Sequence, residues 1–440
     1  MIHRRNIGEI VVWLAALLPL PLWFLAAPAE PLGRRGVAAA TVADIGQMAG
    51  LVGMAMLAIA FVLASRTGVI EDVFGGLDKV YQVHHRLGRA AFMLLIVHPV
   101  AHALRFVPDR LDRALLFLLP THRELAVDLG VYAFWGLLLL MVPTLFVTIA
   151  YDRWKLSHKF LGAVLIVAAI HMLTVRDTPG RTVAVTGNPI LMSYMIALTT
   201  LGVLSFIYKA AVLPFLSRRA VHVVENVERL NDQVIRIELS PRQRRVDFAP
   251  GQFVFVTFDQ EGLSREAHPF TICSVPATGR IVLTVKALGD FTQALHRRLR
   301  PGAKTWVEGP YGRFDYRSAS AEQIWLAAGV GIAPFLSWAR HLAYLGDRSR
   351  RARLYYCVRS RGEAVHYEEF RRIAERQTNL DVTLVCSQER GHVRAADLGD
   401  VRGKDIFMCG PRRFTSDLKA QFLRLGVPNE RIHFEDFEFR

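Results

Sequence analysis

Four histidines interrupt a long apolar stretch of this 440-residue chain. His84, His85, His98 and His102 all lie in "HHRLGRAAFMLLIVHPVAH", although polar side chains are costly at membrane depth. His84 and His98 are 14 residues apart, which brings both side chains to one face of a helix, about 21 Å apart along its axis. His85 misses the face of His98 by about 140°, so His84 is the better partner. Several histidines at helical spacings require a shared partner.

A second apolar segment, "HKFLGAVLIVAAIH", repeats this pattern with His158 and His171, which are 13 residues apart. That spacing requires a bend in the helix or an oblique approach of the rings. Each segment also begins His-x-x-x-Gly, and Gly88 and Gly162 would let a flat macrocycle approach the backbone. Two haems stacked across a membrane, each held by one histidine from each segment, would use all four residues. The alternative is polar side chains that link helices by hydrogen bonds, and two matched pairs favour haem over it.

Six apolar stretches, each near the length of about 20 residues that spans a bilayer, make up the first half of the chain. Lys and Arg near their ends favour a cytoplasmic C-terminal half, because positive residues gather on the inner side. A cleaved signal peptide is the alternative for the first stretch, because Arg4 and Arg5 precede it. We therefore expect an integral, multi-pass protein of a bacterial inner membrane. The stretches lie roughly at 9–27, 45–65, 85–104, 127–150, 157–174 and 189–213.

Composition excludes several classes of partner. The net charge of +15 fits contact with anionic lipid of the inner leaflet, and no nucleic-acid motif accompanies it. All four cysteines lie in the second half without CxxC spacing, which argues against a zinc site or a disulfide framework. The sequence also shows no calcium-binding loop and no extra interaction domain, so we expect no regulatory partner.

The layout of the histidines resembles the ferric reductase and NADPH oxidase superfamily, whose six-helix domain carries two b-type haems between its third and fifth helices. The resemblance implies an inner haem between His84 and His158 and an outer haem between His98 and His171. It also implies three domains: a six-helix transmembrane di-haem domain over 1–215, a ferredoxin-reductase-like antiparallel β-barrel that binds FAD over 216–318, and an NAD(P)H-binding α/β domain over 319–440.

The segment after Ser217 fits the expected flavin domain. Short alternating strands separated by turn residues are typical of a small antiparallel barrel. In the family, a His-Pro-Phe-Thr run at this place cradles FAD, and "HPFT" stands here. Carried over, Phe270 would pack against the isoalloxazine ring and Thr271 would offer a hydroxyl near its reactive edge. His268 would face the ribityl or phosphate region, with Pro269 beside it.

A second flavin element follows in "VKALGDFTQALHRRL", where a strand turns through Gly289 into a helix. Backbone N–H groups around Phe291 and Thr292 would lie at the helix N-terminus, where the FAD pyrophosphate would bind. The segment "GPYGRF", residues 309–314, resembles the family's closing turn of the barrel.

From about residue 320 the pattern changes to alternating strands and helices. In "QIWLAAGVGIAPFLSWARHL", Gly329 and Gly331 would let the backbone approach a phosphate, and Pro334 begins the helix behind it. The next strand ends in Arg359, Ser360 and Arg361. Arginine at this place accommodates a 2′-phosphate, so the cluster favours NADPH over NADH. The alternative is a solvated turn with ordinary surface arginines.

The last motifs are implied by the resemblance alone. "CGP" supplies Cys409, Gly410 and Pro411, with Cys409 expected beside the nicotinamide C4. The end of the chain, "FEDFEFR", resembles family tails that place an aromatic ring over the flavin. Phe439 is the candidate for that ring, and Phe437 is the alternative.

These elements together predict a transmembrane electron-transfer oxidoreductase. NADPH gives two electrons at once and a haem iron takes one, so a flavin must stand between them. The acceptor across the membrane is expected to be dioxygen, giving superoxide, with ferric-chelate reduction as the alternative. His102, one turn beyond His98, lies where family oxidases place a histidine near the oxygen-reducing pocket, and the alternative is a supporting or surface histidine.

One departure from the family weakens the oxidase assignment. Those oxidases carry an arginine near the outer end of the second helix, and "TVADIGQMAG" has none, which leaves Arg34, Arg35 or Arg105 as substitutes. Two other classes were weighed. A nucleotide-gated transporter would need charged residues or broken helices at the bilayer midplane. A haem-only membrane anchor would not need the flavin and nucleotide half.

Overall fold

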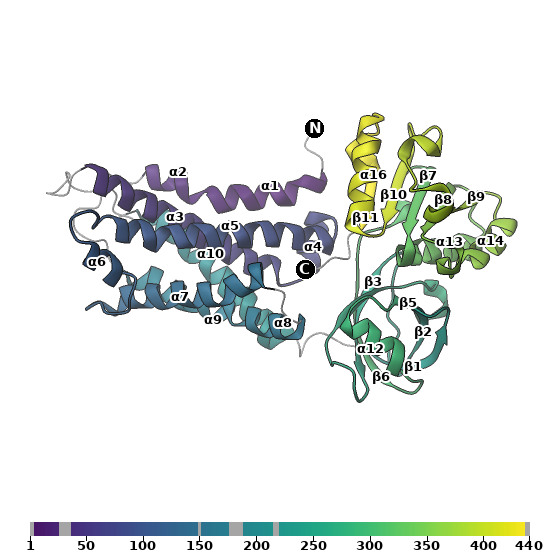
Figure 1. Cartoon of the computed structure of the whole chain (residues 1–440), viewed down its shortest axis with the longest axis horizontal. Coiled ribbons are helices and arrows are strands. Elements are labelled where there is room, and N and C mark those ends of the chain that lie inside the picture. The colour runs from purple at the N-terminus through teal and green to yellow at the C-terminus, as the bar shows by residue number, and fades with distance from the viewer. Residues whose placement is uncertain (1–3, 26–36, 148–150, 176–187, 214–219, 436–440) are drawn as a thin grey trace. The chain divides into compact units, whose positions relative to one another are not determined.

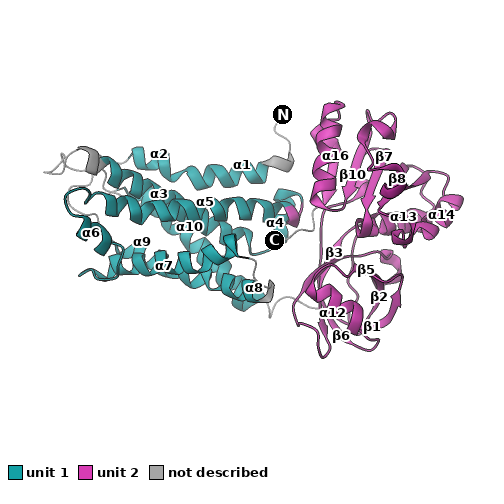
Figure 2. Cartoon of the chain, in the orientation of Figure 1, with its two compact units in different colours: residues 1–75, 79–216 teal, residues 76–78, 217–440 magenta. Residues whose placement is uncertain are grey.

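The computed structural model describes residues 4–25, 37–147, 151–175, 188–213 and 220–435 of the chain. Arg34, Arg35, Phe437 and Phe439 lie outside the described residues. The chain forms two compact units, one of residues 1–75 with 79–216 and one of residues 76–78 with 217–440 (Figure 2).

The first unit is a bundle of helices, as Figure 1 shows. Six helices in its described part are long and apolar enough to cross a membrane, which confirms the predicted six-span architecture. Large apolar side chains such as Leu139 and Phe146 are more than 70% exposed, as expected for helix faces that meet lipid. The helices are α1 Arg4–Leu17, α2 Pro19–Phe24, α3 Val37–Leu63, α4 Gly68–Phe74, α5 Leu77–Leu104, α6 Leu111–Leu116, α7 Leu125–Phe146, α8 Tyr151–Lys159, α9 Leu161–Thr174 and α10 Pro189–Ile207, which continues as a π-helical turn over Tyr208–Val212.

Helix α3 is the central helix of this bundle. Within its span, Thr41–Leu63, 72% of the residues are buried, whereas the other five spans are 22–33% buried. A helix that is apolar on all sides is stable in that position, because no face of it needs to meet water.

The second unit begins with a six-stranded antiparallel sheet in the order β4-β3-β6-β1-β2-β5. Its edge strands meet through a single bridge between Ile272 and Leu283. The sheet is therefore not the fully closed barrel that the sequence predicted. β4 is four residues long and includes Pro269, which has no N–H to donate, so it cannot form a full ladder with β5. The strands are β1 Ala220–Arg229, β2 Val234–Pro241, β3 Phe253–Asp259, β4 His268–Thr271, β5 Ile281–Lys286 and β6 Lys304–Tyr311, and helix α12 spans Asp290–Arg298.

The unit ends with a five-stranded parallel sheet in the order β11-β10-β7-β8-β9. Alternate residues of β7 enter different cores, Trp325 with Phe335 and Trp338, and Leu326 with Leu418. Both faces of the sheet are thus covered, which is the doubly wound arrangement expected for an α/β nucleotide-binding domain. The strands are β7 Glu322–Ala328, β8 Arg351–Val358, β9 Leu380–Cys386, β10 Asp405–Cys409 and β11 Ile432–Glu435, and the helices are α13 Ala333–Leu345, α14 Tyr367–Arg376, α15 Ser387–Arg390 and α16 Arg412–Arg424.

Candidate functional site

The membrane unit brings the predicted histidines together in two pairs. The rings of His84 and His158 have centroids 6.4 Å apart with an angle of 72° between their planes. The rings of His98 and His171 have centroids 6.3 Å apart with an angle of 66°. One histidine of each pair comes from α5, and the others come from the last turns of α8 and α9.

This spacing fits a single metal ion between each pair of rings. A metal–imidazole bond is about 2 Å long and the ring centre lies about 1 Å behind the nitrogen, so two rings that share one ion have centroids about 6 Å apart. Among the described residues, no group of three or more His, Cys, Asp or Glu side chains could hold a metal ion. The pairs therefore suit a metal that brings its remaining ligands with it, as a haem iron does.

Backbone carbonyls orient three of the four rings. A carbonyl oxygen can only accept a hydrogen bond, so each bonded Nδ1 carries the proton and leaves the lone pair of Nε2 available to a metal. The bonds join Nδ1 of His84 to the oxygen of Ala60 at 2.9 Å, Nδ1 of His98 to the oxygen of Gly46 at 2.8 Å, and Nδ1 of His171 to the oxygen of Ala126 at 2.7 Å.

His158 is held differently. Its ring stacks on that of Trp154, with centroids 5.1 Å apart and planes 25° apart. Its Nδ1 is buried and has no hydrogen-bond partner within the part of the chain that the structure describes. The inner pair is therefore tied to the backbone through one ring, and the outer pair through both.

The surroundings of the outer pair include residues that the sequence analysis singled out. His102 is buried, and its ring lies perpendicular to that of His98 with centroids 4.9 Å apart. The guanidinium of Arg105 lies over the ring of Phe117, 5.1 Å from its centroid. Sequence reasoning missed one neighbour: Nδ1 of His122 lies 2.7 Å from a carboxylate oxygen of Asp128.

The glycines named for the haem site have different surroundings. A Cβ at Gly88 would meet no heavy atom within 4 Å, whereas a Cβ at Gly162 would lie 2.1 Å from the ring of Phe206. Gly162 therefore serves the packing of α9 against α10. The glycines that face histidine rings, Gly50 and Gly130, lie on α3 and α7 and were not found from the sequence.

The flavin motif forms β4 as expected. Phe270 points into the core of the antiparallel sheet, near Phe258, and is 9% exposed. Pro269 and Thr271 are half-buried on either side of it. The packing of Phe270 on a flavin ring therefore stays a prediction. The ring of His268 stacks on that of Phe291, with centroids 3.7 Å apart.

The turn before α12 uses the hydroxyl of Thr292 within the protein. Its oxygen accepts hydrogen bonds from the N–H groups of Leu288 at 2.9 Å and Gly289 at 3.0 Å. A pyrophosphate at this helix N-terminus would thus meet the next N–H groups, around Phe291. The carboxylate of Asp290, in the first turn, opposes an anion there.

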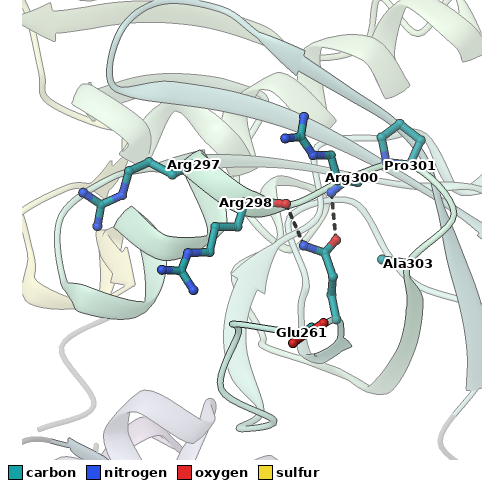
Figure 3. A pocket seen from close by; sticks show the side chains of 7 residues that line it. Glu261, Arg297, Arg298, Arg300, Pro301 and Ala303 are labelled. Carbon is teal, nitrogen blue, oxygen red and sulfur yellow. Dashed lines mark hydrogen bonds between the residues drawn. The ribbon is translucent and has the colours of Figure 1, made fainter.

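The opposite end of α12 borders a shallow surface hollow of about 500 Å³ (Figure 3). Its charged lining consists of Arg297, Arg298, Arg300 and Glu261. Basic side chains stabilise the C-terminal end of a helix, so these arginines have a structural role in α12. The hollow lies away from the turn expected to bind the pyrophosphate.

The glycines of the nucleotide motifs allow a close approach between β7 and β10. A Cβ at Gly331 would lie 2.3 Å from the carbonyl oxygen of Cys409, and one at Gly410 would lie 2.7 Å from the Cβ of Ala328. Gly329 has φ +55°, which favours glycine. β7 and β10 flank the point where the order of the parallel strands reverses, and dinucleotides bind at such points. Cys409 is buried at the end of β10, Pro411 precedes α16, and Pro334 lies in the first turn of α13.

The basic cluster after β8 is divided in its contacts. Arg361 is exposed and forms an ion pair with Glu389, Nε to Oε1 at 3.1 Å. This contact raises the pKa of Arg361 and lowers that of Glu389. Arg359 is exposed, and no side-chain partner of it lies within the described part of the chain. Ser360, between them, is half-buried. Arg359 is therefore better placed than Arg361 to receive a phosphate.

A polar network that sequence reasoning missed links the two sheets of the second unit. Arg340 on α13 binds Glu369 on α14 through two hydrogen bonds of 2.6 and 2.9 Å. A third nitrogen of Arg340 donates to the carbonyl oxygen of Cys273, 2.8 Å away, just beyond β4. His366 adds a 3.0 Å contact to the hydroxyl of Thr284 on β5. These contacts fix the flavin strands relative to the nucleotide-binding helices.

Three family models match successive segments of the chain. A ferric reductase like transmembrane component matches residues 49–169, an FAD-binding domain matches 219–315, and an oxidoreductase NAD-binding domain matches 325–420. The chain belongs to the ferric reductase and NADPH oxidase superfamily. As such it is an oxidoreductase that couples FAD- and NAD(P)H-binding domains to a multi-pass membrane domain.

Relatives of the reductase half support this assignment. The glycine betaine monooxygenase reductase subunit of Pseudomonas aeruginosa is 27% identical over 209 residues, covering 43% of this chain and 56% of the relative. The ferredoxin reductase component of 3-ketosteroid-9-alpha-monooxygenase from Mycobacterium tuberculosis is also 27% identical, covering 46% and 57%. This superfamily member thus spans a little over half the length of those two relatives.

A solved structure shares the fold. The flavohemoglobin of Malassezia yamatoensis, determined with bound FAD and heme, aligns with a TM-score of 0.51 and 16% identity. The alignment covers 92% of this chain and 99% of that protein. At this identity the likeness concerns the fold alone.

Proposed function

We propose that this protein moves electrons from cytosolic NADPH, through FAD and two b-type haems, to a one-electron acceptor on the far side of a bacterial inner membrane. One observation carries the proposal. Two histidine pairs, shared between the same helices, each have the ring spacing that one iron requires, 6.4 Å and 6.3 Å between centroids. The proposed domains are 1–215 for the haems, 216–318 for FAD and 319–440 for NADPH.

FAD supplies the step between the two-electron chemistry of NADPH and the one-electron chemistry of haem iron. The residues of the chain bind and orient these groups. We assign the inner haem to His84 and His158, and the outer haem to His98 and His171. The carbonyl bonds to Nδ1 of three of these rings support the assignment, because they fix the tautomer that can bind iron.

The nucleotide site is proposed at the reversal of strand order. Gly331 and Gly410 keep side chains out of the space between the ends of β7 and β10, so a dinucleotide backbone can lie there. Arg359 is proposed to bind the 2′-phosphate of NADPH because it is exposed at the end of β8. Cys409 is proposed beside the nicotinamide, with Phe439 over the flavin.

The acceptor follows from the ligand set. Two histidines fill both axial positions of each iron, so an acceptor must receive its electron at the haem edge, one electron at a time. Dioxygen would give superoxide, and a ferric chelate would give ferrous iron. The buried ring of His102 against His98, with Arg105 nearby in α5's continuation, supports dioxygen.

The test measures both acceptors on one preparation of the purified full-length protein. If dioxygen is the acceptor, NADPH consumption should collapse without oxygen, and superoxide should account for most electrons in air. Unchanged turnover with a ferric chelate under nitrogen, with little superoxide in air, would assign ferric reduction instead. An absorption spectrum without haem or flavin bands would contradict the proposal and revive a transporter.

A further inference from the structure

Two glycines, each on a helix without histidine ligands, lie against the rings of the outer pair. A Cβ at Gly50 would be 2.5 Å from Nδ1 of His98, and a Cβ at Gly130 would be 2.7 Å from Cε1 of His171. Cβ atoms do not approach other heavy atoms so closely, because van der Waals contact begins near 3.5 Å. Any side chain at either position would displace the ring beside it.

Each glycine stands four residues after the carbonyl to which its histidine donates. His98 binds the oxygen of Gly46 and lies over Gly50, and His171 binds the oxygen of Ala126 and lies over Gly130. In an α-helix the oxygen of one residue already accepts the N–H four residues later. A second donor must therefore approach past the Cβ position of that later residue. Glycine leaves this approach open.

The inner pair lacks this arrangement. His84 donates to the oxygen of Ala60, which also accepts the N–H of Ala64 at 3.1 Å. The residue four positions after that acceptor is thus an alanine, and its methyl group is tolerated. His158 has no backbone acceptor among the described residues. The glycine requirement is specific to the outer pair.

Close packing of helices is the competing explanation, because small residues four apart often allow it. It applies to Gly46 and Gly53, whose nearest atoms include the Cβ of Ala101 and the side chain of Leu95. At Gly50 and Gly130, in contrast, all three of the nearest atoms belong to a histidine ring. These two positions serve the rings rather than the helices.

We propose that Gly50 and Gly130 are positioning residues that dock the outer histidine rings onto backbone carbonyls. The inference rests on the proposed haem function. A histidine ligand whose Nδ1–H is bonded to a carbonyl is oriented and made more basic, which favours the ferric state of its iron. Loss of that bond should therefore raise the reduction potential of the outer haem or release it, and leave the inner haem unchanged.

The test compares Gly50→Ala and Gly130→Ala with Gly53→Ala, a control on α3 that meets only flexible leucine side chains. Haem per chain is measured as the pyridine complex, and both potentials by spectroelectrochemical titration. His84→Ala and His98→Ala provide the spectra of each haem alone. We expect either loss of one of two haems or a shift of the outer potential in both test variants, with neither change in the control.

A double variant separates ring docking from folding. If Gly50 acts through the ring of His98, Gly50→Ala should have no further effect on haem content or yield in the His98→Ala background. An added loss there would overturn the inference in favour of packing, as would an unchanged outer haem in both test variants. A wild-type protein without haem would instead sink the proposed function itself, so the two failures are distinguishable.

Discussion

Replacement of Glu369 by glutamine tests the polar network between the two sheets of the second unit. The carboxylate accepts two hydrogen bonds from Arg340, which in turn holds the carbonyl oxygen of Cys273. Burial alone would raise the pKa of Glu369, but hydrogen bonds with His366 and Arg340 prevail and lower it from 4.5 to about 2. Glutamine keeps the shape of the side chain and removes its charge.

The size of the effect follows from this pKa. Each unit of pKa difference between folded and unfolded states is worth about 1.4 kcal/mol, so the ionised carboxylate contributes up to about 3 kcal/mol to the free energy of unfolding at neutral pH. Glu369 is 28% exposed, and glutamine retains one acceptor, so we expect a loss of about 1–3 kcal/mol. For a unit of this size that lowers Tm by roughly 4–8 °C.

The sign of the pH dependence is fixed by the lowered pKa. The contribution of Glu369 is complete above its unfolded value of 4.5 and is lost as the pH falls toward about 2. Thermal unfolding of the full-length protein, followed by the fluorescence of released flavin, should therefore show a gap between wild type and Glu369→Gln that is full at pH 7 and narrower at pH 3.5.

The neighbouring Glu368 provides a matched control, because its side chain is 72% exposed and pairs with Arg371 at the surface. Glu368→Gln should leave Tm nearly unchanged. Equal Tm values for the two variants at pH 7, or a gap that stays constant down to pH 3.5, would refute the argument.

Other expectations concern the cofactors. Arg359→Ala should raise the KM for NADPH about 10- to 100-fold, because a hydrogen bond between charged groups is worth about 1.5–3 kcal/mol; the KM for NADH should stay unchanged, and equal effects on both would contradict the phosphate contact. Glu389→Gln should lower the KM for NADPH by releasing Arg361, as measured by steady-state kinetics. His98→Ala should halve the haem content in a pyridine haemochrome assay, whereas His85→Ala should retain both haems, and the reverse result would reassign the ligands.

The sequence was sufficient for features that depend on neighbouring residues. Six spans follow from apolar length, and all six are found in the described residues. The pairing of His84 with His158 and of His98 with His171 follows from helical spacing, because equal spacings on two parallel helices align their side chains.

Features formed by distant residues were not predicted. The acceptor of His98 is 52 residues away, and the glycine that faces His171 lies on a different helix. The Arg340–Glu369 network joins segments whose sequences show only ordinary surface charge. The sheet of the flavin half was expected to close, yet the proline in a four-residue β4 prevents a full ladder.

The central helix α3 explains how one neighbour can serve both haem positions. It supplies no ligand, but its carbonyls at Gly46 and Ala60 accept the hydrogen bonds of His98 and His84. The two carbonyls are 14 residues apart, as are the two histidines, so one straight helix can hold both rings. This explains why α3, with 72% of its span buried, is the most buried helix although its residues bear no chemistry of their own. A shift of α3 along its axis would move both acceptors together, so its packing sets the orientation of a ligand to each haem.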